Sequence, residues 1–319
     1  INIKNITSGD AMSSIYDIIT NAYTFDFSGK RGISQAEVLE YARKNNPRLR
    51  KEAYETVLGR YGKEESVLGE IYRNIVLDWV NEGIKIRGYK SPIGIRNLDN
   101  DIPDEAVDAL LKTCVKNAKI FQEYFKLKAK IIGVKKLRRY DIYAPIKGNE
   151  KKIGYEEALK TVLDVFKGFD EKFHSLAERM MKERHIDSDI SKGKKSGAFC
   201  SSVTPEITPY VLLNWVGNHN DMSTLAHELG HAIHSMLAEE KTLFDFQASL
   251  PMAETASIFS EMLLEEEMLK RGMPKDEEIS LLATQIDGIY ASVIRQAYFV
   301  MFEKKAHEII QNGATIDDL

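Results

Sequence analysis

The chain has little cysteine. Its 319 residues contain two cysteines, Cys114 and Cys200, which lie far apart in the sequence. Two such residues do not make the disulfide framework on which small secreted domains depend. A reducing compartment is the simplest setting for these thiols, so we expect a cytoplasmic protein.

An excess of positive charge is also missing. The 44 Lys and Arg residues are outnumbered by 48 Asp and Glu residues, which gives a formal net charge of −4 at pH 7. A protein that binds nucleic acid needs basic side chains to neutralise phosphates. The charge balance therefore argues against a nucleic-acid partner. The basic side chains between residues 126 and 139 are interpreted as a solvated helix surface.

Long apolar runs are absent as well. No stretch reaches the roughly 18 consecutive apolar residues that a membrane-spanning helix needs. The N-terminus lacks the apolar segment of a signal peptide. We therefore predict no membrane partner. The chain begins with Ile1 rather than Met, which suggests a fragment or a processed product of a longer chain.

Helical periodicity is present over most of the chain. The composition, 43% hydrophobic and 29% charged, is ordinary for a globular protein. Apolar residues recur at helical spacing, whereas residues 198–203 and 209–216 are short runs typical of strands. We predict a mainly α fold with one small antiparallel sheet beside the metal-binding helix described next. Residues 1–319 are expected to form a single domain, with a helical part (1–120) and a catalytic part (121–319).

The most informative stretch is residues 221–237, which contains His227-Glu-Leu-Gly-His231. Side chains four residues apart lie on the same face of a helix. Two imidazoles in this arrangement can bind one zinc ion, and Glu228 can flank the metal as a general base without being a ligand. The pattern predicts one Zn²⁺ per chain.

Residues around the motif predict the helix that it requires. Asp221 is a favourable N-cap. An apolar stripe opposite the histidines would face the core; it consists of Leu225, Leu229, Ile233 and Met236. His234 lies one turn beyond His231 on the metal-binding face. We interpret His234 as a histidine that supports the site, because a fourth protein ligand would leave no position for water.

A catalytic zinc ion needs a third protein ligand. The metzincin pattern would require Gly at position 234 and His at position 237, where this chain has His234 and Leu237. A glutamate on a following helix is the other common source, and Glu254, just after Pro251, is placed in a first helical turn. Glu261, two turns later on the same face, could accept the free ring N–H of a ligating histidine. The alternative is that Glu261 is a surface glutamate.

The stretches at residues 227–234 and 252–257 together closely resemble the oligoendopeptidase F branch of the thimet oligopeptidase family of zinc metallopeptidases. Further pieces occur in the order of that family, and the resemblance extends from about residue 120 to the C-terminus; these pieces are residues 140–145, 193–199, 209–215 and 294–299. The resemblance implies a zinc-dependent endopeptidase that hydrolyses oligopeptides by metal-activated water.

The same resemblance suggests that Gly197, Ala198 and Phe199 form the edge on which the peptide backbone docks. Small residues there would let another backbone approach closely. The alternative for the Lys- and Gly-rich residues 193–195 is a solvated hairpin. Enzymes of this kind stabilise the oxyanion with Tyr and His side chains from a later segment that this chain does not contain. We therefore expect those side chains beyond Leu319 and expect the chain alone to bind zinc but to hydrolyse peptides poorly.

Two other functions use the same residues. An all-helical zinc carboxypeptidase also combines this motif with a glutamate, but it needs a pocket for a free carboxylate. A non-catalytic, zinc-stabilised binding domain is the second alternative. The presence of Glu228 argues against it, because a structural zinc site has no use for a base.

Overall fold

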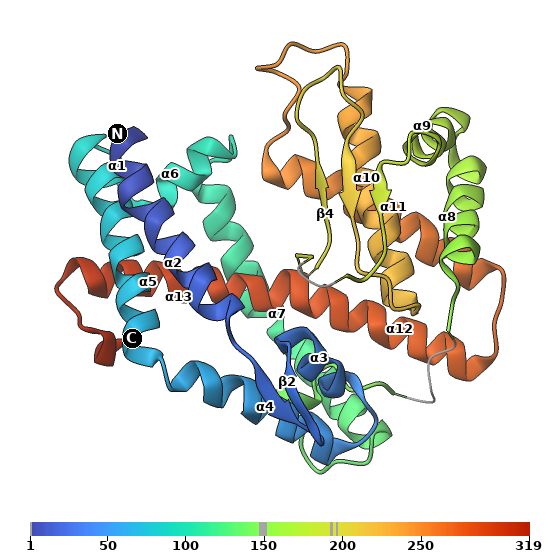
Figure 1. Cartoon of the computed structure of the whole chain (residues 1–319), viewed down its shortest axis with the longest axis horizontal. Coiled ribbons are helices and arrows are strands. Elements are labelled where there is room, and N and C mark those ends of the chain that lie inside the picture. The colour runs from blue at the N-terminus through green and yellow to red at the C-terminus, as the bar shows by residue number, and fades with distance from the viewer. Residues whose placement is uncertain (1, 147–151, 192–193, 196) are drawn as a thin grey trace. The chain divides into compact units, whose positions relative to one another are not determined.

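The computed structural model describes residues 2–146, 152–191, 194–195 and 197–319. The chain is mainly helical (Figure 1), which confirms the predicted fold class. It divides into two compact units, Ile1–Lys147 with Leu282–Leu319, and Gly148–Leu281. The single domain expected from the sequence stays a prediction; residue 120 lies within a helix of the first unit. In the described part of the chain, we find no helix with the length and apolarity needed to cross a membrane.

The first unit is built mostly from helices. Its elements up to residue 147 are α1 (Asn2–Thr7), α2 (Gly9–Asn21), β1 (Phe25–Phe27), β2 (Lys30–Ile33), α3 (Gln35–Glu40), η1 (Tyr41–Arg43), α4 (Pro47–Gly62), α5 (Glu65–Val80), η2 (Asn81–Ile86), α6 (Pro92–Asp99), α7 (Asp104–Ile131) and η3 (Arg139–Asp141). Its C-terminal elements are η4 (Tyr290–Arg295), α13 (Gln296–Gln311) and η5 (Ile316–Asp318). Helix α12 (Lys275–Ile289) contributes its last residues to this unit.

The antiparallel hairpin of β1 and β2 is a second small sheet, absent from the sequence-based prediction. Phe27 pairs with Lys30, so the turn consists of Ser28 and Gly29. Both residues have positive φ angles, 52° and 81°, as the two central residues of a type I′ hairpin turn do. The Ser-Gly dipeptide is a turn signal that could have indicated this hairpin.

The second unit carries the predicted site. It contains α8 (Tyr155–Phe169), α9 (Glu171–Lys182), β3 (Ile186–Asp187), β4 (Phe199–Ser201), β5 (Tyr210–Leu212), α10 (His219–Leu237), α11 (Leu250–Lys270) and the first part of α12. The antiparallel pair β4–β5 confirms the predicted strands. Strand β3 extends this sheet by pairing parallel to β5, which gives the order β3-β5-β4.

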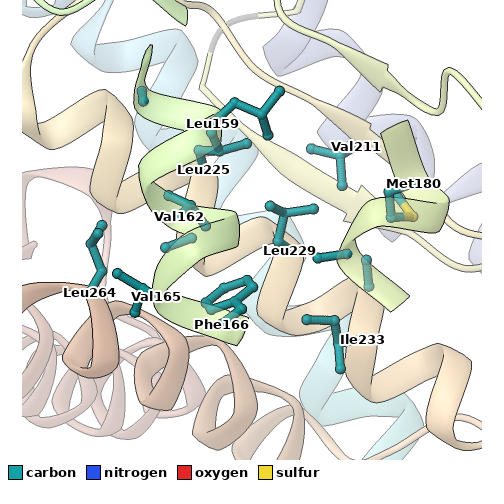
Figure 2. Close-up of a cluster of buried hydrophobic side chains, with 14 of the residues drawn as sticks. Leu159, Val162, Val165, Phe166, Met180, Val211, Leu225, Leu229, Ile233 and Leu264 are labelled. Atoms are coloured by element: carbon teal, nitrogen blue, oxygen red, sulfur yellow. The ribbon is translucent and has the colours of Figure 1, made fainter. Parts of the chain in front are cut away.

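The core of the second unit lies between α8, α9, α10, α11 and this sheet (Figure 2). The predicted stripe of α10 is buried, with Leu225 and Leu229 0% exposed and Ile233 1% exposed. From α8, Phe166 packs into the same cluster and is also 0% exposed. Burying each such side chain stabilises the fold by about 1.5–3 kcal/mol. This burial fixes which face of α10 is left for the histidines.

Candidate metal centre

Helix α10 begins at His219, and its N-cap is Asn218, not the predicted Asp221. The Asn218 side chain accepts a hydrogen bond from the Asp221 backbone N–H (2.9 Å), and the Asp221 carboxylate accepts one from the Asn218 N–H (3.2 Å). The prediction of the cap was therefore wrong. Both residue types cap helices well, and Asp221 at the third helical position completes a capping box that starts with Asn218.

Helices α10 and α11 pack against each other closely at Gly230. A Cβ atom on Gly230 would lie 2.5 Å from Ser260 Oγ and 2.9 Å from the carbonyl oxygen of Ala256. Only small groups on both helices allow this approach. The short separation lets the carboxylates of Glu254 and Glu261 on α11 reach the imidazoles on α10.

His227, His231 and Glu254 bring their ligand atoms together. The Glu254 carboxylate lies 3.6 Å from His227 Nε2 and 3.8 Å from His231 Nε2. The two imidazole rings are nearly perpendicular, at 82°, with centroids 4.8 Å apart. Within the described ranges, these three residues are the group of His, Cys, Asp and Glu side chains that could hold a metal ion.

The spacing of these atoms suits zinc. Ligand atoms about 2.1 Å from a tetrahedral zinc ion lie about 3.4 Å from one another, close to the 3.6 Å and 3.8 Å separations of this site. Two imidazoles and one carboxylate are a ligand set of catalytic zinc, which keeps its fourth position for water. The residues present therefore fit a catalytic zinc ion.

Glu261, which the sequence suggests as a partner of a ligating histidine, contacts the ring of His227. His227 Nδ1 lies 2.5 Å from Glu261 Oε1, and Ser223 Oγ donates to Glu261 Oε2 at 3.4 Å. Burial lowers the pKa of His227, but the contact with Glu261 outweighs it, so the pKa is raised. In the neutral imidazole, this hydrogen bond places the proton on Nδ1 and leaves Nε2 free to bind a metal.

Glu228 lies beside the three potential ligands and is 5% exposed. Its Oε2 atom is buried and has no hydrogen-bond partner among the described residues, while the Cys200 backbone hydrogen-bonds to its carboxyl group. The pKa of Glu228 is raised to about 7, mainly by burial; His227 lowers it, and the charges of Glu254 and Glu261 raise it. A cation at the site would stabilise the carboxylate. The carboxylate is the form of Glu228 that can accept a proton.

The site opens into a cleft of about 370 Å³ within the second unit. Strand β4, helix α10 and residues 246–254 contribute its walls. Apart from Glu228 and the three potential ligands, the lining side chains are apolar or uncharged polar groups and the imidazole of His234. No Lys or Arg is found among the described lining residues.

Strand β4 is the outer strand of its sheet, and Ala198 and Phe199 line the cleft. Cys200 lies opposite Val211, whose backbone N–H donates to the carbonyl oxygen of His185, just before β3, and not to β4. Because backbone groups alternate in direction along a strand, those of Cys200 point away from β5. Gly197 immediately precedes this edge and has a positive φ of 84°. The side of β4 that faces away from β5 thus lies at the cleft, where the Cys200 backbone hydrogen-bonds to the carboxyl group of Glu228. A role of this edge in binding the peptide backbone stays a prediction.

Asn214 fixes the segment that leads into β4. Its side-chain amide donates to the carbonyl oxygens of Lys195 (3.0 Å) and Gly197 (2.8 Å). Residues 193 and 196, part of the stretch that the sequence places in the hairpin or docking edge, lie outside the described residues.

His234 lines the cleft and has no hydrogen bond to a potential ligand among the described residues. Phe246 and Gln247 are among the lining residues that are not predicted from the sequence. They belong to the segment between α10 and α11, which carries no motif. The tertiary structure places them in the wall: the Gln247 amide donates to the carbonyl oxygen of Ser202, the residue after β4, at 3.1 Å.

The chain is similar to known peptidases over most of its length. It is 30% identical over 273 residues to oligoendopeptidase F (chromosomal) of Lactococcus lactis subsp. cremoris, covering 85% of this chain and 45% of that protein. It is 28% identical over 309 residues to the oligopeptidase PepF of Bacillus subtilis, covering 94% and 46%. The chain thus spans slightly less than half the length of these relatives.

Solved structures show the same fold. The crystal structure of oligoendopeptidase-F from Enterococcus faecium superimposes with a TM-score of 0.67 at 21% identity, covering 98% of this chain and 50% of that chain. Residues 40–319 match the family described as Peptidase family M3. This match includes both helices of the metal centre. The chain therefore belongs to peptidase family M3.

Proposed function

We propose that this chain carries the active site of a zinc-dependent endopeptidase that hydrolyses oligopeptides. The observation that supports it most is the convergence of His227, His231 and Glu254 beside the buried carboxyl group of Glu228. The proposal takes His227, His231 and Glu254 as ligands of one Zn²⁺ per chain. When bound there, zinc would acidify a water molecule and polarise the scissile carbonyl group.

Glu228 is the general base and acid of the proposed reaction. Its carboxylate accepts a proton as the water oxygen attacks the carbonyl carbon, and it then delivers that proton to the nitrogen of the breaking peptide bond. A carboxylate that lines the same cleft as the three potential ligands can carry out both transfers. Glu261 keeps His227 in the orientation and tautomer that a ligand requires.

The edge of β4 is the proposed binding site for the peptide backbone. An extended peptide can add to a strand edge by main-chain hydrogen bonds. Ala198 and Phe199 line the cleft that contains the three potential ligands, and Gly197 immediately precedes them, which supports assigning the three residues to this role. Main-chain pairing accepts many sequences, which suits an enzyme that acts on varied oligopeptides. The names of the relatives support oligopeptides as the substrate class.

A cytoplasmic location is part of the proposal and is supported by Cys114 and Cys200, which are both free thiols. The proposal includes no nucleic-acid and no membrane partner, in keeping with the net charge of −4. The carboxypeptidase alternative is disfavoured by the lining of the cleft, which offers no Lys or Arg to a free carboxylate in its described part.

The test uses the zinc-loaded chain and an internally quenched peptide blocked at both ends. We expect cleavage at an interior bond, detected by mass spectrometry with the protein in excess so that slow turnover is seen. The Glu228→Gln chain should keep its zinc but lose at least about 100-fold in rate. Cleavage only of peptides with a free carboxylate would support a carboxypeptidase. Zinc binding without any hydrolysis, equal in both proteins, would support a binding domain.

A further inference from the structure

The cleft wall contains an imidazole that the proposed reaction does not use. His234 lies on α10, three residues after His231, and lines the cleft beside Ser235. It is half-buried. It does not belong to the group whose ligand atoms lie within 4.8 Å of one another, although it lines the same cleft as those three residues. His234 is therefore near the metal centre without being part of the ligand set.

The polar groups around His234 hydrogen-bond to one another. Ser202 Oγ donates to Ser235 Oγ at 2.7 Å, and the Gln247 side-chain amide donates to the carbonyl oxygen of Ser202 at 3.1 Å. His234 makes no hydrogen bond within the part of the chain that the structure describes. Its ring can donate one hydrogen bond and accept another. Because His234 lines the cleft, water or a ligand there can make these hydrogen bonds with its ring.

From these contacts we propose that His234 binds the backbone of the peptide substrate, donating a ring N–H to a peptide carbonyl oxygen close to the scissile bond. The inference rests on the proposed function and extends it. Three helical residues advance about 4.5 Å along the axis, whereas an extended peptide advances about 3.4 Å per residue. For a peptide that runs along α10, the carbonyl group that His234 contacts then belongs to a residue one or two positions from the scissile bond.

An uncharged peptide group is the partner that this wall suits best. A substrate carboxylate would call for a Lys or Arg side chain, and the described lining of the cleft has neither. Apolar lining residues such as Phe199 and Leu250 would not stabilise a charged group either. The proposal therefore predicts that His234 acts equally on peptides with blocked and with free C-termini.

The experiment measures peptide binding apart from hydrolysis. In the zinc-loaded Glu228→Gln chain, an end-blocked fluorescent peptide should bind without being cleaved, and its Kd is read by fluorescence anisotropy. Adding His234→Leu should raise Kd about 3- to 10-fold, the loss expected for one hydrogen bond. His234→Gln keeps an N–H donor and should restore most of the affinity. His174→Leu, the same change on α9 outside the cleft, should leave Kd unchanged.

Zinc content and melting temperature distinguish peptide binding by His234 from metal ligation and from a structural role. Both should be the same in the His234 variants and in the parent. Loss of zinc in His234→Leu would make His234 a ligand and overturn the proposal. An unchanged Kd, or a loss confined to peptides with a free carboxylate, would also overturn it. If the wild-type chain cleaves peptide while Kd is unchanged, only the role of His234 fails. If the Glu228→Gln chain binds no peptide and the wild type cleaves none, both the proposed function and the role of His234 fail.

Discussion

His227 Nδ1 and Glu261 Oε1 lie 2.5 Å apart, although the two residues are 34 positions apart in the chain and stand on different helices. The carboxylate accepts the ring N–H on the side of the imidazole opposite to Nε2, which faces Glu254 at 3.6 Å. One contact thus sets both the orientation of the ring and the nitrogen that is free for a metal. The affinity of the site for zinc should depend on it.

Replacing Glu261 by Gln tests this dependence. The amide keeps the size of the side chain but removes the charge, so we expect zinc affinity to fall about 10- to 100-fold. Competition with a zinc-binding dye measures the affinity. Glu266→Gln, an exposed glutamate of the same helix paired with Lys270, is the matched control and should change little. A loss of less than about threefold in Glu261→Gln would show that the contact does not support the site.

Replacing His231 and replacing Glu254 should reduce the zinc content to different extents. His231→Ala should abolish stoichiometric zinc after dialysis, because the site loses one of its two imidazoles, whose ring centroids lie 4.8 Å apart. Glu254→Gln should weaken zinc binding less, because the Glu254 side chain is 52% exposed and water can replace one carboxylate oxygen. Metal analysis of both proteins decides the matter. One zinc per chain in His231→Ala would disprove the assignment.

Gly230 should tolerate no side chain. In Gly230→Ala, the added Cβ would collide with Ser260 Oγ and with the Ala256 carbonyl oxygen, so α10 and α11 must separate. We expect a loss of about 1–3 kcal/mol in the free energy of unfolding and weaker zinc binding. Gly168→Ala in α8, where no atom lies within 4 Å of the added Cβ, should instead be neutral or stabilising by up to about 1 kcal/mol. Urea unfolding compares the two; equal stabilities would refute the close contact.

Cys200 should react slowly with alkylating agents. Burial, aided by the charge of Glu228, raises the pKa of its thiol from 9.0 to about 12. A rise of three units leaves about 1,000-fold less thiolate at pH 8, and only the thiolate reacts. The rate of modification by iodoacetamide, followed by peptide mapping, should increase about tenfold per pH unit from pH 8 to 10. A rate that levels off near pH 9 would mean that the thiol is not shifted.

The parts of the site that depend on local geometry could be predicted from the sequence. The i, i+4 spacing of His227 and His231 places both rings on one face of any helix, and the buried stripe from Leu225 to Met236 determines which face remains outside. Glu254 and Glu261 could be chosen for the same reason, since they share a face of α11 just after Pro251. The helix start was missed because Asn218 and Asp221 are both good caps, and only their joint hydrogen bonds decide between them.

The features of the site that the sequence could not predict depend on contacts between segments far apart in the chain. The approach of α11 to α10 at Gly230 brings Glu254 and Glu261 within reach of the histidines. Likewise, β3 pairs parallel to β5. Phe246 lies in the cleft wall, next to Gln247, whose side-chain amide donates to the Ser202 carbonyl oxygen. No sequence motif marks β3 or the segment that contains Phe246. The raised pKa of Glu228 has the same origin, because burial is a property of all the atoms around a carboxyl group. A helical pattern specifies which side chains point the same way, but the tertiary structure alone determines what they meet.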